Sequence, residues 1–238
     1  KSRRSTGYWG TPDYQPIMND ESIPEWLCRD EPGTSIFAVG FRESSSWQYR
    51  MAASLIRNFF AAIHRGEMEF SLDDDAIDIR AATLGKLFQD QHIIEAAEES
   101  SQLEDFEYAG HLYDCLTSEE AKKKTLEVQG LGKVLVQMLI RDGLPKRLSI
   151  IRNGMIITDS LEKFGDKFVA FRMYKDFVAF VEPLENEGSA LIKRLENPKH
   201  DGLSAERIPD EDKRAISTRI MRELAKKIRE AIRSEVLS

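Results

Sequence analysis

An Asn-Gly pair at residues 153–154 constrains the fold of this chain more than any other short feature. It separates two apolar runs, residues 148–150 and 155–157. Asn and Gly accept the positive φ angles that a two-residue type I′ turn requires, so the pattern predicts a β-hairpin. Two more strand-like segments flank the glycines between residues 122 and 140. The sequence therefore predicts a sheet that contains antiparallel hairpins.

Two long amphipathic helices are expected, one before and one after these strands. A serine cluster at residues 44–46 is a source of N-cap side chains, and an apolar face follows it until Gly66. So broad a face needs a large partner surface, so this helix should lie across a sheet. The second helix, residues 210–238, begins with acidic residues at its positive end. The expected apolar face of the first helix is Trp47, Met51, Leu55, Phe59 and Ile63, with Ile56 and Phe60 beside them. In the second helix it is Ile216, Ile220, Leu224, Ile228 and Ile232.

The remaining segments complete an α+β fold with a two-layer α/β arrangement, in which a mixed sheet packs on helices. Residues 1–32 are rich in Gly, Pro and aromatic side chains, which predicts irregular structure. We expect a buried strand at 36–39, a hairpin at 67–79, two or three helices at 81–118, a strand at 177–181 and a helix at 188–195.

This order of elements suggests four regions. Residues 1–43 form the end of one domain, residues 44–120 connect it to the next, residues 121–208 form a second domain, and residues 209–238 form the terminal helix.

Composition narrows the class of protein. The formal net charge is −7, which argues against a general nucleic-acid coat but allows a local basic patch. The two cysteines, Cys28 and Cys115, lack the spacing of a zinc site and fit a reducing compartment. No apolar run approaches the roughly 20 residues of a membrane span, and no signal peptide is visible. We expect a cytoplasmic protein with no membrane partner and no metal site of its own.

Two short segments are candidate ligand contacts. Gly33 and Thr34 precede the predicted strand at 36–39, where a glycine lets the backbone approach a ligand and a hydroxyl can both donate and accept. Lys199 lies between Pro198 and Gly202, on a loop that could present its charge to a phosphate. Each segment also has a plain structural interpretation. Residues 33–34 would be an ordinary start of a strand, and Lys199 would be an exposed loop lysine.

Together these segments resemble a known family. Residues 33–36, Gly-Thr-Ser-Ile, resemble the glycine-threonine box of the gyrase/chaperone/histidine-kinase/MutL (GHKL) ATPase superfamily. Residues 151–156, a following helix near residues 161–164 and the strand at 177–181 resemble the transducer domain of MutL-like and MORC-like members. The chain also looks like bacterial ATP-binding proteins in which a comparable region follows a GHKL domain.

The resemblance implies a nucleotide-binding role for Thr34, Gly33 and Lys199. Thr34 would help to hold adenine, and Lys199 would reach the γ-phosphate. ATP and Mg²⁺ would be cofactors of the parent protein, because the Asn- and Glu-bearing box and the glycine-rich loop of the family are missing here. Catalytic residues are therefore not expected within this chain. Its partners would be its own upstream ATP-binding domain and a second copy in a homodimer.

Two other functions stay open. The terminal helix carries cations that could bind DNA or an acidic partner, and the same cations could simply be a solvated helix face. The chain could also be an interaction domain with no nucleotide role. The candidate nucleic-acid-binding residues are Arg219, Arg222, Lys226, Lys227, Arg229 and Arg233.

Overall fold

The computed structural model describes residues 25, 32–35, 46–72, 76–169, 171–199 and 201–237. The chain divides into two units, Lys1–Ser44 and Ser45–Ser238. The strand expected at residues 36–39, and most of the irregular segment expected at 1–32, lie outside the described residues. The architecture that follows is that of the second unit.

The second unit begins with a helical region that carries a small hairpin. The long helix α1 is followed by a two-stranded antiparallel sheet that pairs Phe70 with Ile79, and this sheet is the hairpin expected at residues 67–79. Three further helices come next, so the expectation of two or three is met at its upper limit. The elements are α1 (Trp47–His64), β1 (Phe70–Leu72), β2 (Ile77–Ile79), α2 (Ala81–Leu87), α3 (Gln91–Glu99) and α4 (Leu103–Thr117).

A five-stranded sheet forms the centre of the unit, with strand order β3-β4-β7-β5-β6. The β3–β4, β4–β7 and β5–β6 pairs are antiparallel, whereas β5 and β7 run parallel. Asn153 and Gly154 have φ angles of 49° and 72°, so the Asn-Gly turn forms as predicted. The strands are β3 (Lys122–Val128), β4 (Gly132–Ile140), β5 (Arg147–Arg152), β6 (Met155–Thr158) and β7 (Phe177–Pro183).

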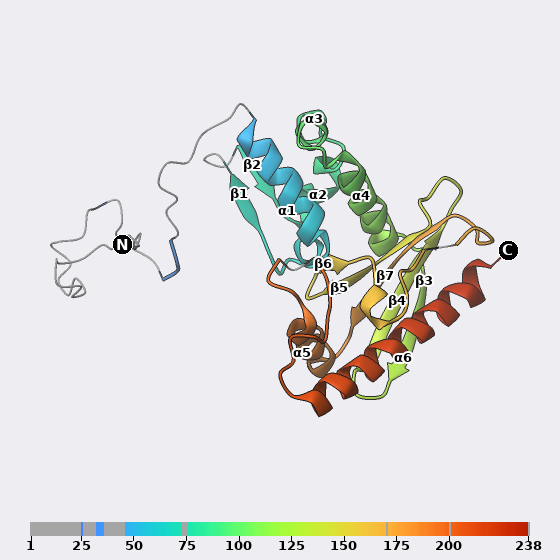
Figure 1. Cartoon of the computed structure of the whole chain (residues 1–238). Coiled ribbons are helices and arrows are strands. Elements are labelled where there is room, and N and C mark those ends of the chain that lie inside the picture. The colour runs from blue at the N-terminus through green and yellow to red at the C-terminus, as the bar shows by residue number, and fades with distance from the viewer. Residues whose placement is uncertain are drawn as a thin grey trace, which may run out of the picture. The chain divides into compact units, whose positions relative to one another are not determined.

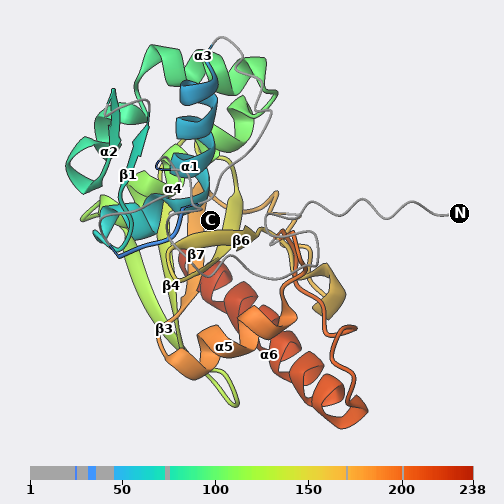
Figure 2. The same cartoon turned by 90° about the vertical axis from the view of Figure 1, so that its left-hand side faces the viewer.

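Helices cover both faces of this sheet (Figures 1 and 2). One face packs against α1 and α4, and the other packs against α5 (Asn186–Leu195) and α6 (Glu211–Val236). The central strand β7 is buried along its whole length because its side chains alternate between two hydrophobic cores. The α+β class and the long C-terminal helix are thus as predicted, and the structure adds a second helical layer to the two expected layers. The short 3₁₀ helix η3 (Glu162–Phe164) lies between β6 and β7.

The described parts of residues 45–120, 121–208 and 209–238 pack against one another within this unit. Val178 and Phe180 of β7 share one core with α1 and α4, and Phe177 and Val181 share the other with α6. The sheet is therefore common to both cores.

The apolar faces of the two long helices differ in part from the predicted faces. Met51 is 40% exposed and Ile216 is 49% exposed, although both belong to the expected stripes. A row of residues spaced by four drifts by about 40° at each step, because an α-helix turns about 100° per residue. The early members of each row therefore rotate away from the core, and Ala52 and Met221 are buried instead.

Candidate functional site

Lys199 lies at the tip of a closed turn that follows α5. Glu196 and Leu203 form an antiparallel bridge at the base of this turn, and the Asn197 amide donates to the Gly202 carbonyl over 3.0 Å. The Asp201 amide donates to the Asn197 side chain over 3.1 Å, which closes the turn from within. Lys199 is exposed, and no acidic partner for it is found among the described residues. The turn thus presents an unpaired ammonium group to solvent.

A buried ion pair anchors this turn to the sheet. Arg152, at the end of β5, donates to Glu196 through Nε and Nη2 of its guanidinium, and Nη2 lies 2.9 Å from Oε2. Arg152 is 8% exposed and Glu196 is 7% exposed, so the pair is shielded from water. Two parallel charge-assisted hydrogen bonds fix both distance and orientation. The base of the Lys199 turn is therefore held rigidly against β5.

The β5–β6 turn, one residue further along the chain, is tied to α1 and β7. The Ala62 amide donates to the Gly154 carbonyl over 3.3 Å, and the Gly154 amide lies 3.4 Å from a carboxylate oxygen of Glu182. Arg65 donates to the same carboxylate over 2.8 Å, and this hydrogen bond raises the pKa of Arg65. Polar contacts thus connect α1 and β7 with the Asn153-Gly154 turn, and the backbone of residues 152–154 joins this turn to the ion pair at the base of the Lys199 turn.

A small polar pocket lies beside the Lys199 turn. Its volume is about 230 Å³, and Asp201 of the turn lines it together with Arg147 of β5. The pocket also holds Arg57, Asp105 and Asp159, so two cations face three carboxylates. Because the carboxylates outnumber the cations, the pocket itself does not favour an anionic ligand. The unpaired positive charge of the turn is that of Lys199, which does not line this pocket.

Gly33 and Thr34 belong to the first unit, whereas Lys199 belongs to the second. Both residues are exposed. Their assignment to the adenine end of a nucleotide site stays a prediction.

The six cations predicted on α6 separate into two groups. Lys227 donates to the Glu127 carbonyl over 2.6 Å, and Arg229 binds Asp166 and stacks 4.5 Å from the Phe171 ring centroid. The hydrogen bond to Asp166 raises the pKa of Arg229. Lys227 and Arg229 therefore bind other segments of the fold. The exposed group is Arg219, Arg222, Lys226 and Arg233.

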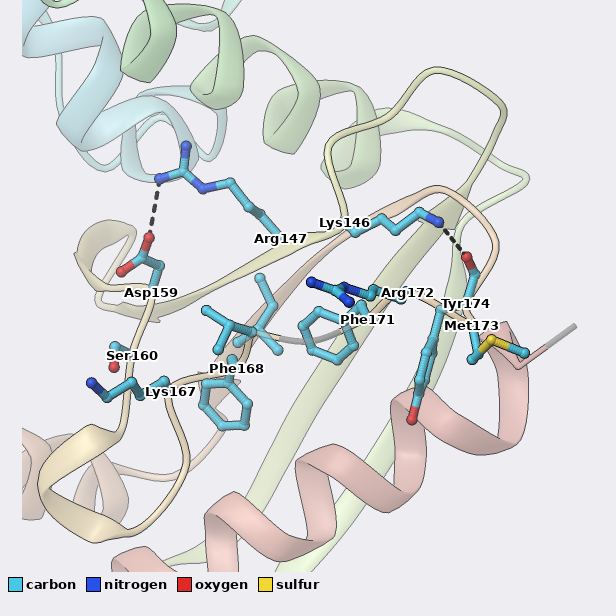
Figure 3. Close-up of a pocket in the computed structure, with 12 residues that line it drawn as sticks. Lys146, Arg147, Asp159, Ser160, Lys167, Phe168, Phe171, Arg172, Met173 and Tyr174 are labelled. Carbon is cyan, nitrogen blue, oxygen red and sulfur yellow. Dashed lines mark hydrogen bonds and ion pairs between the residues drawn. The ribbon is translucent and has the colours of Figure 1, made fainter.

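A larger cleft, which the sequence reasoning missed, lies between the start of β5 and the loop that joins η3 to β7 (Figure 3). Its volume is about 1190 Å³. The signal that could have found it is the interleaving of cations and aromatic residues along the loop, because such interleaving is typical of anion-binding surfaces. The residues in question are Lys163, Phe164, Lys167, Phe168, Phe171, Arg172, Tyr174 and Lys175.

Searches for a metal centre and a membrane span find neither in the described part of the chain. Within it, no three His, Cys, Asp or Glu side chains are grouped so that they could hold a metal ion. None of the described helices is both long enough and apolar enough to cross a bilayer. Comparison of the chain with protein-family models, with curated proteins and with solved structures finds no match.

Proposed function

We propose that this chain is the transducer region of a GHKL-type, ATP-dependent protein, in which Lys199 senses the terminal phosphate of a nucleotide. One observation carries the proposal: an exposed, unpaired lysine stands at the tip of a turn whose base is fixed by a buried ion pair. A mobile surface lysine would lose side-chain entropy on binding, whereas a preformed turn lowers the cost of placing its ammonium group.

The phosphate contact would act as a switch. A charge-assisted hydrogen bond contributes about 1.5–3 kcal/mol, which is sufficient to shift a two-state equilibrium by roughly tenfold or more. Loss of the γ-phosphate would release the Lys199 turn. The Arg152–Glu196 pair would pass this change to β5, and the contacts of Gly154 would pass it to α1. The chain would thus couple nucleotide state to closure or dimerisation of the parent protein.

ATP and Mg²⁺ would be held mainly by an upstream domain, with Gly33 and Thr34 at the adenine end. Lys199 has the chemistry to meet a phosphate, because an ammonium group supplies a compact positive charge and rotatable donors. Magnesium would neutralise phosphate charge when it is bound. The part proposed for this chain is phosphate sensing alone.

The test compares nucleotide affinities in the full-length protein. Lys199→Ala should weaken nucleoside triphosphate binding by about tenfold to a hundredfold and leave diphosphate binding unchanged, because only the triphosphate offers the contact. Lys193→Ala is the matched control, since Lys193 is an exposed lysine on α5. Equal triphosphate affinities for the two variants would refute the role of Lys199.

A second candidate function is nucleic-acid binding by α6. At about 100° per residue, Arg219, Arg222, Lys226 and Arg233 fall within about 60° of one another around the helix, and they extend over about 21 Å of its length. Such a row could contact several phosphates. Binding should then fall steeply with salt, with a logarithmic slope of about −0.9 for each phosphate contacted. Arg222→Glu should reduce both affinity and slope, and a flat salt dependence would leave α6 as a solvated face.

A further inference from the structure

A pocket lies among the three helices that follow the small hairpin. α2, α3 and α4 pack beside α1 (Figure 1), and residues of all three helices line a cavity of about 530 Å³. Small-molecule sites have volumes of this order and combine apolar walls with a few polar groups. None of the described residues that line the pocket belongs to the Lys199 turn or to α6, so it is separate from the sites described above.

Aromatic side chains form the wall of this pocket. The Phe88 ring stacks on the Tyr113 ring with centroids 5.3 Å apart, and its centroid lies 5.4 Å from that of Phe106. Phe106 is buried, whereas Phe88 and Tyr113 are partly exposed where they line the pocket. Aromatic rings pack well against apolar groups, and their faces also attract cations. The wall therefore fits a ligand with an apolar or aromatic body.

The wall is preformed because hydrogen bonds fix the short connection between α2 and α3. The Phe88 amide donates to the Leu84 carbonyl over 3.1 Å, which extends α2 as far as the pocket. The Asp90 carboxylate accepts from two amides at the start of α3 over 2.9 and 3.2 Å. A ligand would not have to order this connection, which lowers the free-energy cost of binding.

Two unpaired carboxylates stand at the rim of the pocket. Glu107 and Asp114 line it from one face of α4, because seven residues make about two helical turns. Both are exposed, and neither has an ion pair or a side-chain hydrogen bond in the part of the chain that the structure describes. Burial raises the pKa of Tyr113, and the negative charge of Asp114 raises it further. The negative potential therefore extends from the rim to the aromatic wall.

The charge at the pocket stays negative when nearby residues are counted. Among the described residues that line it there is no lysine or arginine, and His111 is neutral in the formal charge at pH 7. The charged residues next in sequence to the lining residues are Lys86, Asp90, Glu95 and Asp105. Arg57 lies 3.3 Å from Asp105 and offsets its charge, and Lys86 offsets one of the other two carboxylates. The pocket therefore attracts cations.

Two helix glycines leave space along the aromatic wall. Gly85 of α2 and Gly110 of α4 line the pocket, although glycine within a helix lowers stability. Protein packing does not demand glycine at either position. A Cβ at Gly85 would lie 3.6 Å from the Tyr113 hydroxyl, and one at Gly110 would lie 3.5 Å from the Phe88 ring, which are ordinary contact distances. Glycine at these positions therefore keeps the pocket open.

We propose that this pocket binds a small organic ammonium ion, with its apolar body on the aromatic wall and its charge at Glu107 or Asp114. An inorganic cation would leave the aromatic wall uncovered, and a neutral aromatic compound would leave both carboxylates unpaired. The proposal goes beyond phosphate sensing and does not depend on Lys199 or on a bound nucleotide, so the two sites can fail separately.

The experiment uses the full chain and two probes that share one ring. Phenethylammonium carries a positive charge, and phenethyl alcohol is its neutral counterpart. Phenethylammonium should bind about threefold to tenfold more tightly, because it adds an interaction with a carboxylate and with the face of a ring. Titrations followed by NMR measure both affinities.

Removal of the charge at the rim should affect one probe and not the other. In the double variant Glu107→Gln/Asp114→Asn, the affinity for phenethylammonium should fall to that for phenethyl alcohol, which should bind as before. Glu98→Gln on α3 is the matched control, since Glu98 is exposed and does not line the pocket. It should leave both affinities unchanged.

Filling the pocket should affect both probes alike. Gly110→Leu places a side chain along the Phe88 ring and should weaken both probes by about tenfold or more, because it occupies the space of their ring. Gly110→Ala is the milder variant. It should weaken both probes and also raise the unfolding temperature by about 2–4 °C, because alanine favours the helix more than glycine does. Circular dichroism measures this temperature and checks that each variant is folded.

Several results would overturn the proposal. One is equal affinity of the unaltered chain for the two probes, or binding of neither. Another is an unchanged affinity for phenethylammonium in the double charge variant, or an equal loss in Glu98→Gln. A third is undiminished binding of both probes by folded Gly110→Leu. If Gly110→Leu does not fold, undiminished binding by Gly110→Ala has the same meaning.

Discussion

Arg152 and Glu196 form a bidentate ion pair that is buried between β5 and the end of α5, 44 residues apart in the sequence. The pair joins the sheet to the turn that carries Lys199. The same pair therefore contributes to the stability of the fold and positions the turn that carries the candidate functional side chain.

Removal of one member of this pair should destabilise the fold strongly. Glu196→Ala leaves a buried, uncompensated guanidinium, which costs about 3–5 kcal/mol. Urea denaturation measures the difference in the free energy of unfolding. Lys163→Ala is the control, because it removes an exposed pair with Glu206 and should change stability by about 1 kcal/mol or less. Similar losses in the two variants would show that the Arg152–Glu196 pair is not shielded.

Two glycines with the same backbone requirement should respond very differently to a methyl group. Gly154 and Gly143 have φ angles of 72° and 85°, so alanine is strained at both. At Gly154 the new Cβ would also lie 2.4 Å from the Ala62 amide nitrogen, whereas nothing lies within 4 Å at Gly143. Gly143→Ala should cost about 1–2 kcal/mol from conformation alone. Gly154→Ala should cost a further 1–3 kcal/mol or so from overpacking, measured by thermal and urea unfolding.

The local elements of this fold are readable from the sequence because their signals are local. Asn153-Gly154 specifies its own turn through the φ angles that these residues accept. The sequence also locates the helices, but it predicts their buried faces less accurately. Residues spaced by four lie on a line that winds around the helix. Packing against the core determines which part of that line is buried.

Local sequence patterns do not predict which distant segments pair with one another. The parallel β5–β7 pair and the Arg152–Glu196 contact depend on tertiary structure, and no spacing rule connects their residues. The large cleft of Figure 3 was missed because two segments supply its lining. Lys146 and Arg147 are far in sequence from Arg172, and each of the two segments alone looks like an ordinary exposed strand end or loop.

Cys115 should be chemically inert in the folded chain. It is fully buried, and burial raises the pKa of its thiol to about 12, so almost no reactive thiolate exists at pH 8. In a Cys28→Ser variant, in which Cys115 is the remaining thiol, a disulfide reagent should label the protein slowly under native conditions and rapidly in urea. Rapid native labelling would mean that α4 opens readily from the sheet.

Glu235 should make stability depend on acid pH. Lys124 and Lys122 on β3 bond its carboxylate and lower its pKa to about 2, compared with an ordinary value of about 4.3. A lowered folded-state pKa stabilises the fold above about pH 4.3, and this contribution is lost as the pH falls towards 2. Lys124→Ala should raise the Glu235 pKa, measured by carboxyl NMR titration, and its unfolding midpoint should approach that of the unaltered chain as the pH falls. Lys226→Ala, on the exposed side of α6, should leave the Glu235 titration unchanged. A Glu235 pKa near 4.3 in the unaltered chain would mean that α6 is not tied to β3 through this carboxylate.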